Sequence, residues 1–476
     1  MKYNKVTEKI LNELRDIAGS ANVWTVEEKL RACSRDESTS MIGSDERYMP
    51  EVVVAPKDAS QVSLIMKLAN RARIPVTPRG GGTGLSGGAL PLFGGIIITD
   101  ERMNKIIEID SENMTATVEP GVITSEINAA AAEKKLWYAG YPMSTESCHI
   151  GGNIAENAGG GNAVKYGVTM RYVLGLEVVI PTGEILCLGG KLMKDVSGYN
   201  LKELFVGSEG TLGFVTKIIL KLLPLLKNRV ALLALFPDTE AAIAAVPRII
   251  SESGITPTSI EYIDSYCYVK SCEFLNEELP TDGVGAVLLI ELDGTNAETL
   301  ELDADAAGQI CADADALEIY VADNTTTRER VWAVRRNIDE ALRLSDPAQI
   351  DEDIVVPVSA IPAFVRGLAE ISAKYDARIV NFGHAGDGNL HPSILKNADT
   401  TDEEWRKMQK EIEMEIFLLT RRLGGVISGE HGIGSKRREY LAKLCQPEQL
   451  AVMKAIKRAL DPLYIMNPGK IFDMEG

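Results

Sequence analysis

Three of the four histidines in the chain stand in two short glycine-rich runs. His384 and His391 lie in residues 383–392, Gly-His-Ala-Gly-Asp-Gly-Asn-Leu-His-Pro, and His431 lies in residues 428–434, Ser-Gly-Glu-His-Gly-Ile-Gly. Imidazole and carboxylate groups bind metals and carry protons. Glycine lets the backbone turn sharply and lets a ligand approach closely. The two runs therefore indicate a site that handles a metal ion or a proton, rather than two tight turns with incidental polar residues.

Residues 79–88 form a loop that is suited to an anion. The loop reads Arg-Gly-Gly-Gly-Thr-Gly-Leu-Ser-Gly-Gly, so backbone N–H groups, two hydroxyls and an arginine can surround one pyrophosphate. Gly82, Gly84 and Gly87 match the dinucleotide fingerprint, but an expected strand at 96–99 follows where the Rossmann version requires a helix. No Gly-Lys-Ser/Thr follows the run, which excludes a P-loop. We expect phosphate binding on a different scaffold.

Two further glycine-rich loops follow, at residues 147–161 and 207–213. Both lie between expected helices and strands of one α+β region. A single phosphate group would need only one such loop, so three of them suggest a long, extended cofactor.

The composition excludes several function classes. A chain of 476 residues is too long for one ordinary core, so two or three domains are expected. The net charge of −18 argues against nucleic acid or an anionic membrane as the main partner. No apolar stretch is long enough to span a bilayer and no signal core follows the first residues, so we expect a cytoplasmic protein. The seven cysteines are scattered without a Cys-x-x-Cys pair, which suggests neither a disulfide framework nor a thiolate-bound cluster.

The expected strands and helices around these runs indicate two domains with different patterns of secondary structure. A β-α-β start is expected over residues 52–78, ahead of the first glycine-rich loop. Beyond Pro224 the sequence predicts two β-α-β units. The first has strands at 230–236 and 259–263 around a helix at 240–251, and the second has strands at 286–292 and 317–321 around a helix at 297–311. One helix is expected over 327–344. A strand is expected at 378–381, directly before the first histidine run. This order predicts a second domain around an antiparallel sheet.

Taken together, these motifs resemble a known family. The first 225 residues resemble the FAD-binding domain of the vanillyl-alcohol-oxidase type, in Pro-Arg-Gly-Gly-Gly-Thr-Gly-Leu-Ser-Gly-Gly, Ile-Gly-Gly-Asn-Ile-Ala-x-Asn-Ala-Gly-Gly, Lys-Tyr-Gly-Val-Thr and Gly-Ser-Glu-Gly-Thr-Leu-Gly. The rest resembles the metal-dependent D-2-hydroxy-acid dehydrogenase branch, in the two histidine runs and in Asn-Pro-Gly-Lys-Ile-Phe near the end. That branch holds the glycolate oxidase flavin subunit, D-lactate dehydrogenases and D-2-hydroxyglutarate dehydrogenase.

The resemblance implies an α+β fold, with a two-subdomain FAD-binding domain and an α+β cap domain around an antiparallel sheet. The implied division is an N-terminal helical segment at 1–45, the FAD-binding domain at 46–224, the substrate or cap domain at 225–424, and a C-terminal segment at 425–476 that packs back on the FAD domain.

The resemblance also implies two cofactors, FAD and one divalent metal ion (zinc, iron or manganese). The implied metal ligands are His384, His391 and Glu430. The implied catalytic residues are His431 as proton acceptor, Arg335 as clamp for the substrate carboxylate, and Asn389 against the substrate. The implied FAD contacts are Arg79, Gly80, Gly81, Gly82, Thr83, Gly84, Ser86, Gly87, Ser144, Ser147, His149, Gly151, Gly152, Asn153, Asn157, Gly159, Gly160, Glu209, Gly210, Gly213 and Asn467. For His149, a hydrogen bond near the flavin and covalent flavin attachment both stay open.

The expected reaction is metal-assisted oxidation of a small D-2-hydroxy acid to the 2-oxo acid, with hydride transfer to flavin N5. Asp339 and Asp351 stand where the 2-hydroxyglutarate enzymes carry a threonine and a lysine, which favours a monocarboxylate such as D-lactate. Glycolate or D-2-hydroxyglutarate, with an iron–sulfur subunit or a quinone as acceptor, is the alternative. A nucleotide-binding metallohydrolase and a flavoprotein that only relays electrons are alternatives of other classes.

An electron-transferring flavoprotein is the expected partner, because the chain is acidic and has no cluster cysteines of its own. Some relatives couple lactate oxidation to NAD and ferredoxin through such a partner, by electron bifurcation or its reverse. The resemblance therefore also implies coupling of the oxidation to NAD and ferredoxin.

Overall fold

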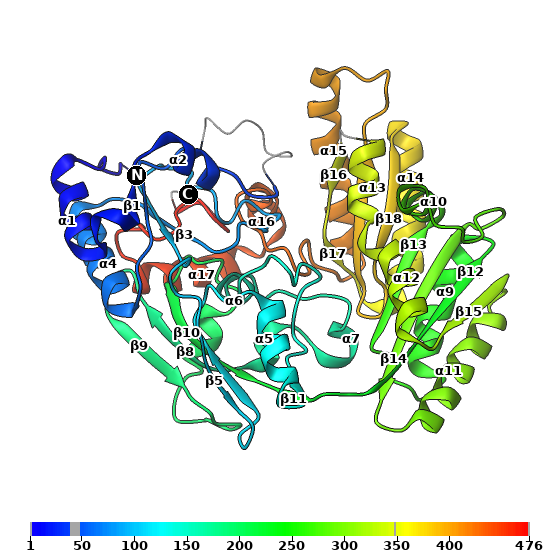
Figure 1. Ribbon diagram of the computed structural model, residues 1–476. Helices are drawn as coiled ribbons and strands as arrows, with labels where there is room; N and C mark the ends of the chain where they lie inside the picture. The colour runs from blue at the N-terminus through cyan, green and yellow to red at the C-terminus, as the bar shows by residue number, and fades with distance from the viewer. Residues whose placement is uncertain (1, 39–47, 347–348, 475–476) are drawn as a thin grey trace. The chain divides into compact units, whose positions relative to one another are not determined.

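The computed structural model describes residues 2–38, 48–346 and 349–474. The chain forms two compact units (Figure 1), and three stretches far apart in sequence make up the first of them. The first unit comprises Met1–Gly159, Val168–Leu225 and Glu430–Gly476, and the second comprises Gly160–Gly167 and Leu226–Gly429.

The first unit contains two main sheets. The smaller has the order β1-β2-β4-β3, and both β2 and β3 run parallel to β4. The larger is antiparallel, with the order β5-β6-β10-β8-β9, and a separate short pair joins β7 to β11. The strands are β1 (Val23–Trp24), β2 (Val52–Val54), β3 (Val76–Arg79), β4 (Ile96–Thr99), β5 (Ile106–Asp110), β6 (Thr115–Val118), β7 (Leu136–Trp137), β8 (Val173–Val179), β9 (Ile185–Gly189), β10 (Phe214–Lys221) and β11 (Leu223–Pro224).

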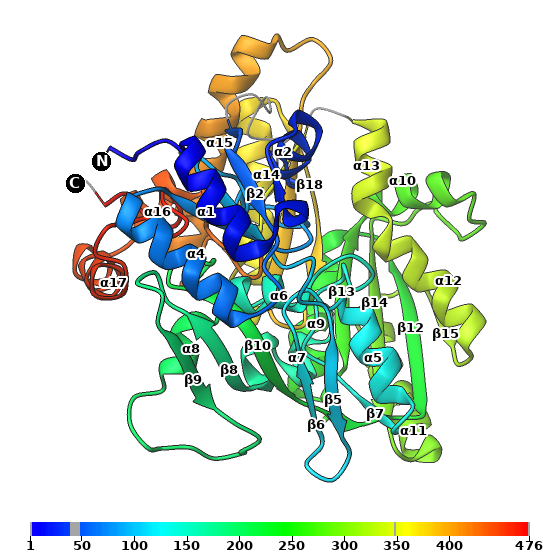
Figure 2. The same ribbon diagram turned by 60° about the vertical axis from the view of Figure 1, so that its left-hand side comes forward.

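The parallel sheet is covered by helices whose apolar residues recur at helical spacing. Helices α1 and α4 lie side by side (Figure 2), and Leu14 of α1 and Ile65 of α4 are fully buried in one core with β2 and β4. The α-helices of this unit are α1 (Glu8–Ala18), α2 (Glu27–Cys33), α4 (Ala59–Ala72), α5 (Thr124–Ala132), α6 (Ile150–Glu156), α8 (Leu201–Phe205), α16 (Arg438–Leu444) and α17 (Pro447–Leu460). Residues 80–95, all described, contain no helix, which confirms that the loop at 79–88 is not of the Rossmann type.

The second unit is built on one antiparallel sheet of eight strands. Along the sheet the order is β15-β12-β14-β13-β18-β19-β16, and β17 pairs with β19 as well. Strands β12 and β14 pair along their whole length, and their residues are almost all buried, as expected for strands with both faces covered. The strands are β12 (Asn228–Phe236), β13 (Ser259–Asp264), β14 (Ala286–Gly294), β15 (Glu318–Ala322), β16 (Gln349–Asp351), β17 (Ile354–Val355), β18 (Arg378–His384) and β19 (Asn389–Leu395).

Helices cover both faces of this sheet. Helices α10, α12 and α13 pack on the face that carries Leu233, Leu289 and Phe382. Helices α9 and α11 contact β12 and β14, and α14 contacts β18. Helix α15 packs on α14. The α-helices are α7 (Ala163–Tyr166), α9 (Thr239–Ser251), α10 (Ser265–Leu275), α11 (Ala297–Ala312), α12 (Thr325–Arg336), α13 (Ile338–Ser345), α14 (Ile361–Tyr375) and α15 (Asp402–Arg422). The expected antiparallel cap domain is confirmed.

The expected single helix over 327–344 is wrong, because the chain forms α12 and α13 with a break at Asn337. The Asn337 side chain donates from Nδ2 to the Ala333 carbonyl at 2.8 Å, and its backbone dihedrals (φ −100°, ψ 11°) leave the helical region. Asparagine side chains compete for backbone hydrogen bonds in this way. Apolar residues recur across the break, so hydrophobic periodicity alone did not reveal it.

Helix α7 belongs to the second unit although its neighbours in sequence belong to the first. Lys165 donates from Nζ to Asp293 Oδ1 at 2.5 Å, and the Tyr166 hydroxyl donates to the same carboxylate at 2.9 Å. The Asp293 side chain is fully buried at the end of β14. These charge-assisted hydrogen bonds fasten residues 160–167 to the large sheet.

Candidate active site

The hairpin of β18 and β19 positions two histidines on one face of the large sheet. His384 is the last residue of β18. His391 of β19 pairs with Phe382, which lies two residues before His384 in β18. Side chains two residues apart on a strand point to the same face, so both imidazoles lie on the α10–α12–α13 side. The ring centroids are 5.5 Å apart and nearly perpendicular, and both residues are buried.

The hairpin requires glycine at two positions, one in the turn and one in β18. Gly388 has φ +83°, and a Cβ there would lie 2.0 Å from the Val356 carbonyl oxygen. Gly383 has φ +148°, and a Cβ there would lie 2.6 Å from the Asn389 carbonyl oxygen. Any side chain at either position would displace the backbone that carries the histidines.

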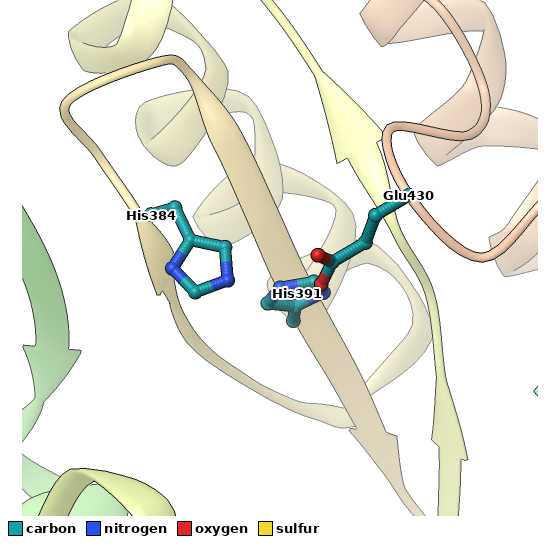
Figure 3. Close-up of side chains that lie close together, drawn as sticks. All are labelled: His384, His391 and Glu430. Atoms are coloured by element: carbon teal, nitrogen blue, oxygen red, sulfur yellow. The ribbon is translucent and has the colours of Figure 1, made fainter. Parts of the chain in front are cut away.

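Glu430 reaches the two histidines from a separate stretch of chain. It follows Gly429, the last residue of the second unit. Candidate ligand atoms of His384, His391 and Glu430 all lie within 4.8 Å of one another, and Figure 3 shows the three side chains converging. Two ligands bound at about 2.1 Å to one metal are at most about 4.2 Å apart, so inward shifts of well under 1 Å would complete the set. The residues therefore fit a divalent metal ion.

Glu261, in the middle of β13, is a site residue that the sequence analysis missed. Its carboxylate oxygens both lie 2.8 Å from His384 Nδ1, and Ser259 Oγ donates to Oε1 at 2.7 Å. Burial by itself would raise the pKa of Glu261, but the His384 and Arg335 charges outweigh it and lower the pKa to about 2. A carboxylate on Nδ1 leaves Nε2 of His384 for a metal and fixes the ring orientation. The available signal was an acidic residue inside an apolar strand pattern.

Arg335, the expected carboxylate clamp, lies in α12 on the other side of the same carboxylate. Its Nε donates to Glu261 Oε2 at 2.7 Å, and its guanidinium stacks over Phe382 at 5.0 Å from the ring centroid. The side chain is 7% exposed. Within the described ranges Nη1 and Nη2 make no hydrogen bond, so these two atoms are the ones left for a ligand. The neighbouring Arg336 is exposed and pairs with Glu329.

Asn389 and His431 have different surroundings. Asn389 is buried, and its Nδ2 donates to Asp353 Oδ1 at 2.8 Å and to the Ile354 carbonyl at 2.9 Å. Both of these hydrogen bonds go to protein atoms, so Oδ1 is the atom that would contact a substrate. His431 is partly exposed, and its Nε2 lies 3.6 Å from Glu430 Oε1. That distance fits two groups that meet a common ligand better than a direct hydrogen bond.

The first glycine-rich loop, in the other unit, contains polar atoms suited to a pyrophosphate. Arg79 Nη1 and Ser86 Oγ are buried without a hydrogen-bond partner. A Cβ built on Gly84 in this loop, or on Gly152 in α6, would meet no atom within 4 Å. A bound phosphate would satisfy unpartnered donors of this kind. The residues therefore fit FAD.

The other expected FAD residues lie in the three glycine-rich stretches or next to them. Ser144 and Ser147 are exposed, and a Cβ on Gly81 would lie 2.6 Å from the Ser147 carbonyl oxygen. Asn153 donates to Thr124 Oγ1 at 2.8 Å, and Asn157 Oδ1 accepts from the Met170 N–H at 2.8 Å. The expected loop at 147–161 is partly helical, because α6 spans Ile150–Glu156, and Gly151 lies in that helix. The remaining expected residues lie in non-helical parts of the three glycine-rich stretches, namely Gly80, Gly82, Thr83, Gly87, Gly159, Gly160, Gly210 and Gly213.

Glu209 and Asn467 hold protein loops together. The Glu209 carboxylate accepts from the Ile433 and Gly434 N–H groups at 2.7 and 2.6 Å, which fastens the stretch just after His431. Burial raises the pKa of Glu209, and these two hydrogen bonds lower it in part. Asn467 donates from Nδ2 to the carbonyls of Gly88 and Glu209, while its Oδ1 is buried without a partner.

His149 lies directly before α6 and is hydrogen-bonded to a buried aspartate. Its Nδ1 lies 2.9 Å from Asp100 Oδ1, and this hydrogen bond raises the pKa of His149. The His149 ring also lies 3.4 Å from the position that a Cβ on Gly81 would take. The imidazole is therefore next to the first glycine-rich loop, with Nδ1 engaged by Asp100.

Comparison with known proteins identifies the class that the fold and the two sets of residues define. The family model for the FAD binding domain matches residues 50–189, and the model for the C-terminal domain of FAD linked oxidases matches residues 225–471. The chain belongs to the FAD-linked oxidase family and is an FAD-linked oxidoreductase. The expected FAD cofactor and the expected two-part fold are confirmed.

Two relatives indicate the branch, and one solved structure shows the fold. The chain is 44% identical over 424 residues to the glycolate oxidase subunit GlcD of Bacillus subtilis, covering 89% of each chain. It is 36% identical over 481 residues to D-lactate dehydrogenase of Anaerostipes hadrus, covering 99% of this chain and 98% of that one. Its fold is similar to p-cresol methylhydroxylase with substrate bound, at TM-score 0.80 and 19% identity, covering 100% and 99% of the two chains. Among the described helices, none is long and apolar enough to cross a membrane.

Proposed function

We propose that the protein oxidises a small D-2-hydroxy acid, with D-lactate favoured, to the corresponding 2-oxo acid. Glycolate and D-lactate, in the names of the two relatives, are both 2-hydroxy acids. The observation that carries the proposal is that one buried carboxylate, Glu261, contacts both His384 and Arg335. A 2-hydroxy acid has its hydroxyl and carboxylate on adjacent carbons, so it suits a metal ligand and a cationic clamp that are held this close together.

His384, His391 and Glu430 would hold one divalent metal ion, and imidazole with carboxylate suits zinc, iron or manganese. When bound, such an ion lowers the pKa of a coordinated hydroxyl and polarises it. Three protein ligands would leave such an ion open to the substrate hydroxyl and one carboxylate oxygen.

The remaining residues act on the substrate directly. Arg335 offers Nη1 and Nη2 to the substrate carboxylate, and a bidentate guanidinium fixes its plane. A ring nitrogen of neutral His431 takes the hydroxyl proton, a role commonly worth about two to four powers of ten in rate. Asn389 lies against the substrate through Oδ1. Bound FAD supplies the acceptor for the hydride from the substrate carbon.

Two acidic residues favour a monocarboxylate. Asp339 is exposed in the first turn of α13, and Asp351 ends β16, where Gln349 Nε2 donates to its Oδ2 at 3.2 Å. Neither position offers a cation to a second carboxylate, and like charges repel. D-Lactate is therefore preferred over D-2-hydroxyglutarate, and glycolate is the nearest alternative.

Anaerobic flavin reduction tests this proposal. The FAD-loaded, metal-replete protein is mixed with D-lactate, L-lactate, glycolate and D-2-hydroxyglutarate in turn, and flavin bleaching is followed. We expect D-lactate to bleach the flavin fastest. Treatment with a chelator should stop the bleaching without releasing FAD, and zinc, manganese or iron(II) should restore it. Absence of bleaching by every 2-hydroxy acid would overturn the proposal.

For the electron acceptor, we propose an electron-transferring flavoprotein, with coupling to NAD and ferredoxin as an extension. Five of the seven cysteines are buried, and all seven are free thiols. Within the described ranges the one group of possible metal-binding residues is His384, His391 and Glu430, which contains no thiol. Affinity capture from native extract tests this partner, and recovery of an iron–sulfur protein alone would contradict it.

A further inference from the structure

Asp353 is a fully buried carboxylate that joins the two stretches carrying the candidate metal ligands. It lies between β16 and β17, at 0% exposure. Its Oδ1 accepts from Asn389 Nδ2 at 2.8 Å. Its Oδ2 accepts from Ser428 Oγ at 2.7 Å and from the Gly429 N–H at 3.0 Å. All four residues belong to the second unit, so these contacts lie within one compact body.

Each partner of Asp353 is directly connected to a candidate ligand. Asn389 begins β19, two residues before His391, and it pairs with His384 across the hairpin. Gly429 is the residue before Glu430. The two stretches are otherwise separated in the chain by α15 and its flanking loops. One carboxylate therefore connects the histidine hairpin to the residue that precedes the glutamate.

The packing around Asp353 leaves little freedom for this connection. Strand β17, which follows Asp353, pairs with β19 on one side, and Val355 exchanges two backbone hydrogen bonds with Val426 on the other, at 3.0 and 2.9 Å. A Cβ on Gly429 would lie 2.6 Å from Asn389 Nδ2. The two stretches thus touch at a glycine, and the hydrogen bonds to Asp353 hold them at that close approach.

A carboxylate suits this position better than an amide does. All three groups that face Asp353 in these contacts are donors, and an ionised carboxylate has only acceptors. Hydrogen bonds to an ionised group are roughly twice as strong as those between neutral groups. An asparagine would turn its own N–H₂ toward a donor on one side and would lose at least one contact.

From this geometry we propose that Asp353 is a positioning residue that holds Glu430 in register with His384 and His391 and thereby sets the metal affinity of the site. This inference rests on the proposed metal site. It adds that the affinity depends on a carboxylate that does not itself touch the metal. Groups that orient metal ligands from outside typically contribute about 10- to 100-fold in metal affinity.

The test compares zinc affinity in FAD-loaded wild type, Asp353→Asn and Ser428→Ala, by competition with a chromophoric chelator. We expect Asp353→Asn to weaken zinc binding about 10- to 100-fold while FAD content is unchanged. Ser428→Ala removes one of the contacts described above, so its effect should be smaller and in the same direction. Excess zinc should restore substrate-driven flavin bleaching to Asp353→Asn, because the lost property is affinity.

Glu291→Gln is the matched control. Glu291 is a buried carboxylate of the same unit that accepts from Trp332 Nε1 at 2.5 Å and pairs with Arg229 at 3.3 Å, outside the two metal-bearing stretches. This substitution should lower the thermal midpoint to a similar extent and leave zinc affinity within about twofold. Equal zinc affinity in wild type and Asp353→Asn, or equal weakening in Glu291→Gln, would overturn the inference. No zinc binding by wild type would instead reject the proposed metal site itself.

Discussion

Glu261 and Arg335 form a buried ion pair, with Nε 2.7 Å from Oε2, at 0% and 7% side-chain exposure. The same carboxylate contacts His384 Nδ1 at 2.8 Å. One carboxylate therefore orients a candidate metal ligand and a candidate substrate clamp together. Breaking a buried pair from one side leaves an uncompensated charge, so substitutions at its two ends should have different signatures.

Replacing Arg335 should weaken substrate binding. In Arg335→Met the guanidinium is lost, and we expect KM for D-lactate to rise by about 10- to 150-fold, which corresponds to the roughly 1.5–3 kcal/mol of a charged hydrogen bond. Zinc affinity should change much less, because Glu261 still contacts His384. Steady-state kinetics and zinc competition on the same preparations measure both quantities.

Arg336→Met is the control for that substitution. Arg336 is the next residue in α12, but its side chain is 40% exposed and pairs with Glu329 on the surface. Exposed ion pairs of this kind contribute little. We expect KM and stability close to those of wild type, and a KM as high as that of Arg335→Met would argue against a specific clamp.

Replacing Glu261 should affect both halves of the site. Glu261→Gln keeps the side-chain volume but removes the charge that compensates Arg335, so we expect the free energy of unfolding to fall by about 3–5 kcal/mol. Zinc affinity should fall about 10- to 100-fold and KM should rise, since ring and guanidinium both lose their partner. Urea unfolding, zinc competition and kinetics test the three effects.

The neighbouring strand provides the matched variant for Glu261. Glu291 is also buried, accepts from Trp332 Nε1 at 2.5 Å, and pairs with Arg229 at 3.3 Å. Glu291→Gln should destabilise the protein without weakening zinc binding. If both glutamine variants lost zinc equally, the contact between Glu261 and His384 would have no special role.

The open space at Gly84 predicts a selective loss of FAD. A Cβ at Gly84 meets no protein atom within 4 Å, so Gly84→Ala should leave the thermal stability of the apoprotein unchanged. The added methyl group would occupy space expected for the cofactor, and we expect FAD affinity to fall by at least about tenfold, which is about 1.4 kcal/mol. Flavin fluorescence titration of the apoprotein measures this change.

Gly190→Ala tests whether open space alone explains such a result. A Cβ at Gly190 also meets nothing within 4 Å, but Gly190 follows β9 and lies outside the three glycine-rich loops. Its FAD affinity should equal that of wild type. Unchanged affinity in Gly84→Ala would mean that the first loop does not hold the cofactor closely.

The pKa of Cys311 predicts a pH dependence of stability. Burial raises the pKa of this thiol from 9.0 to about 12. Because the folded pKa lies above the unfolded one, its contribution to stability is complete below pH 9 and is lost as pH rises toward 12. The stability advantage of wild type over Cys311→Ala should therefore shrink by about 1.4 kcal/mol per pH unit above 9. Urea unfolding of wild type and Cys311→Ala across that range measures it, and a constant difference between them from about pH 9 to 11 would contradict the prediction.

Much of the fold could be predicted from the sequence, because it is encoded locally. Strands β12 and β14 are continuous apolar runs, and the absence of a helix after residues 79–88 follows from the residues that come next. The break between α12 and α13 could not be predicted, because it depends on an Asn337 hydrogen bond that hydrophobic periodicity does not detect. Residues 160–167 join the second unit through Asp293, more than a hundred residues away in the chain, and no local pattern signals that.

For the site, the sequence by itself determined which chemical groups are present: two histidines and a glutamate in glycine-rich runs, an arginine in a helix, and loops suited to a pyrophosphate. Those groups are recognisable because their chemistry and spacing are local. Only the tertiary structure decided that Glu261 contacts both His384 and Arg335, and that Asp353 joins Asn389 to Gly429. A carboxylate in a strand has no distinctive spacing, and its role arises only when folding brings distant donors within hydrogen-bond distance.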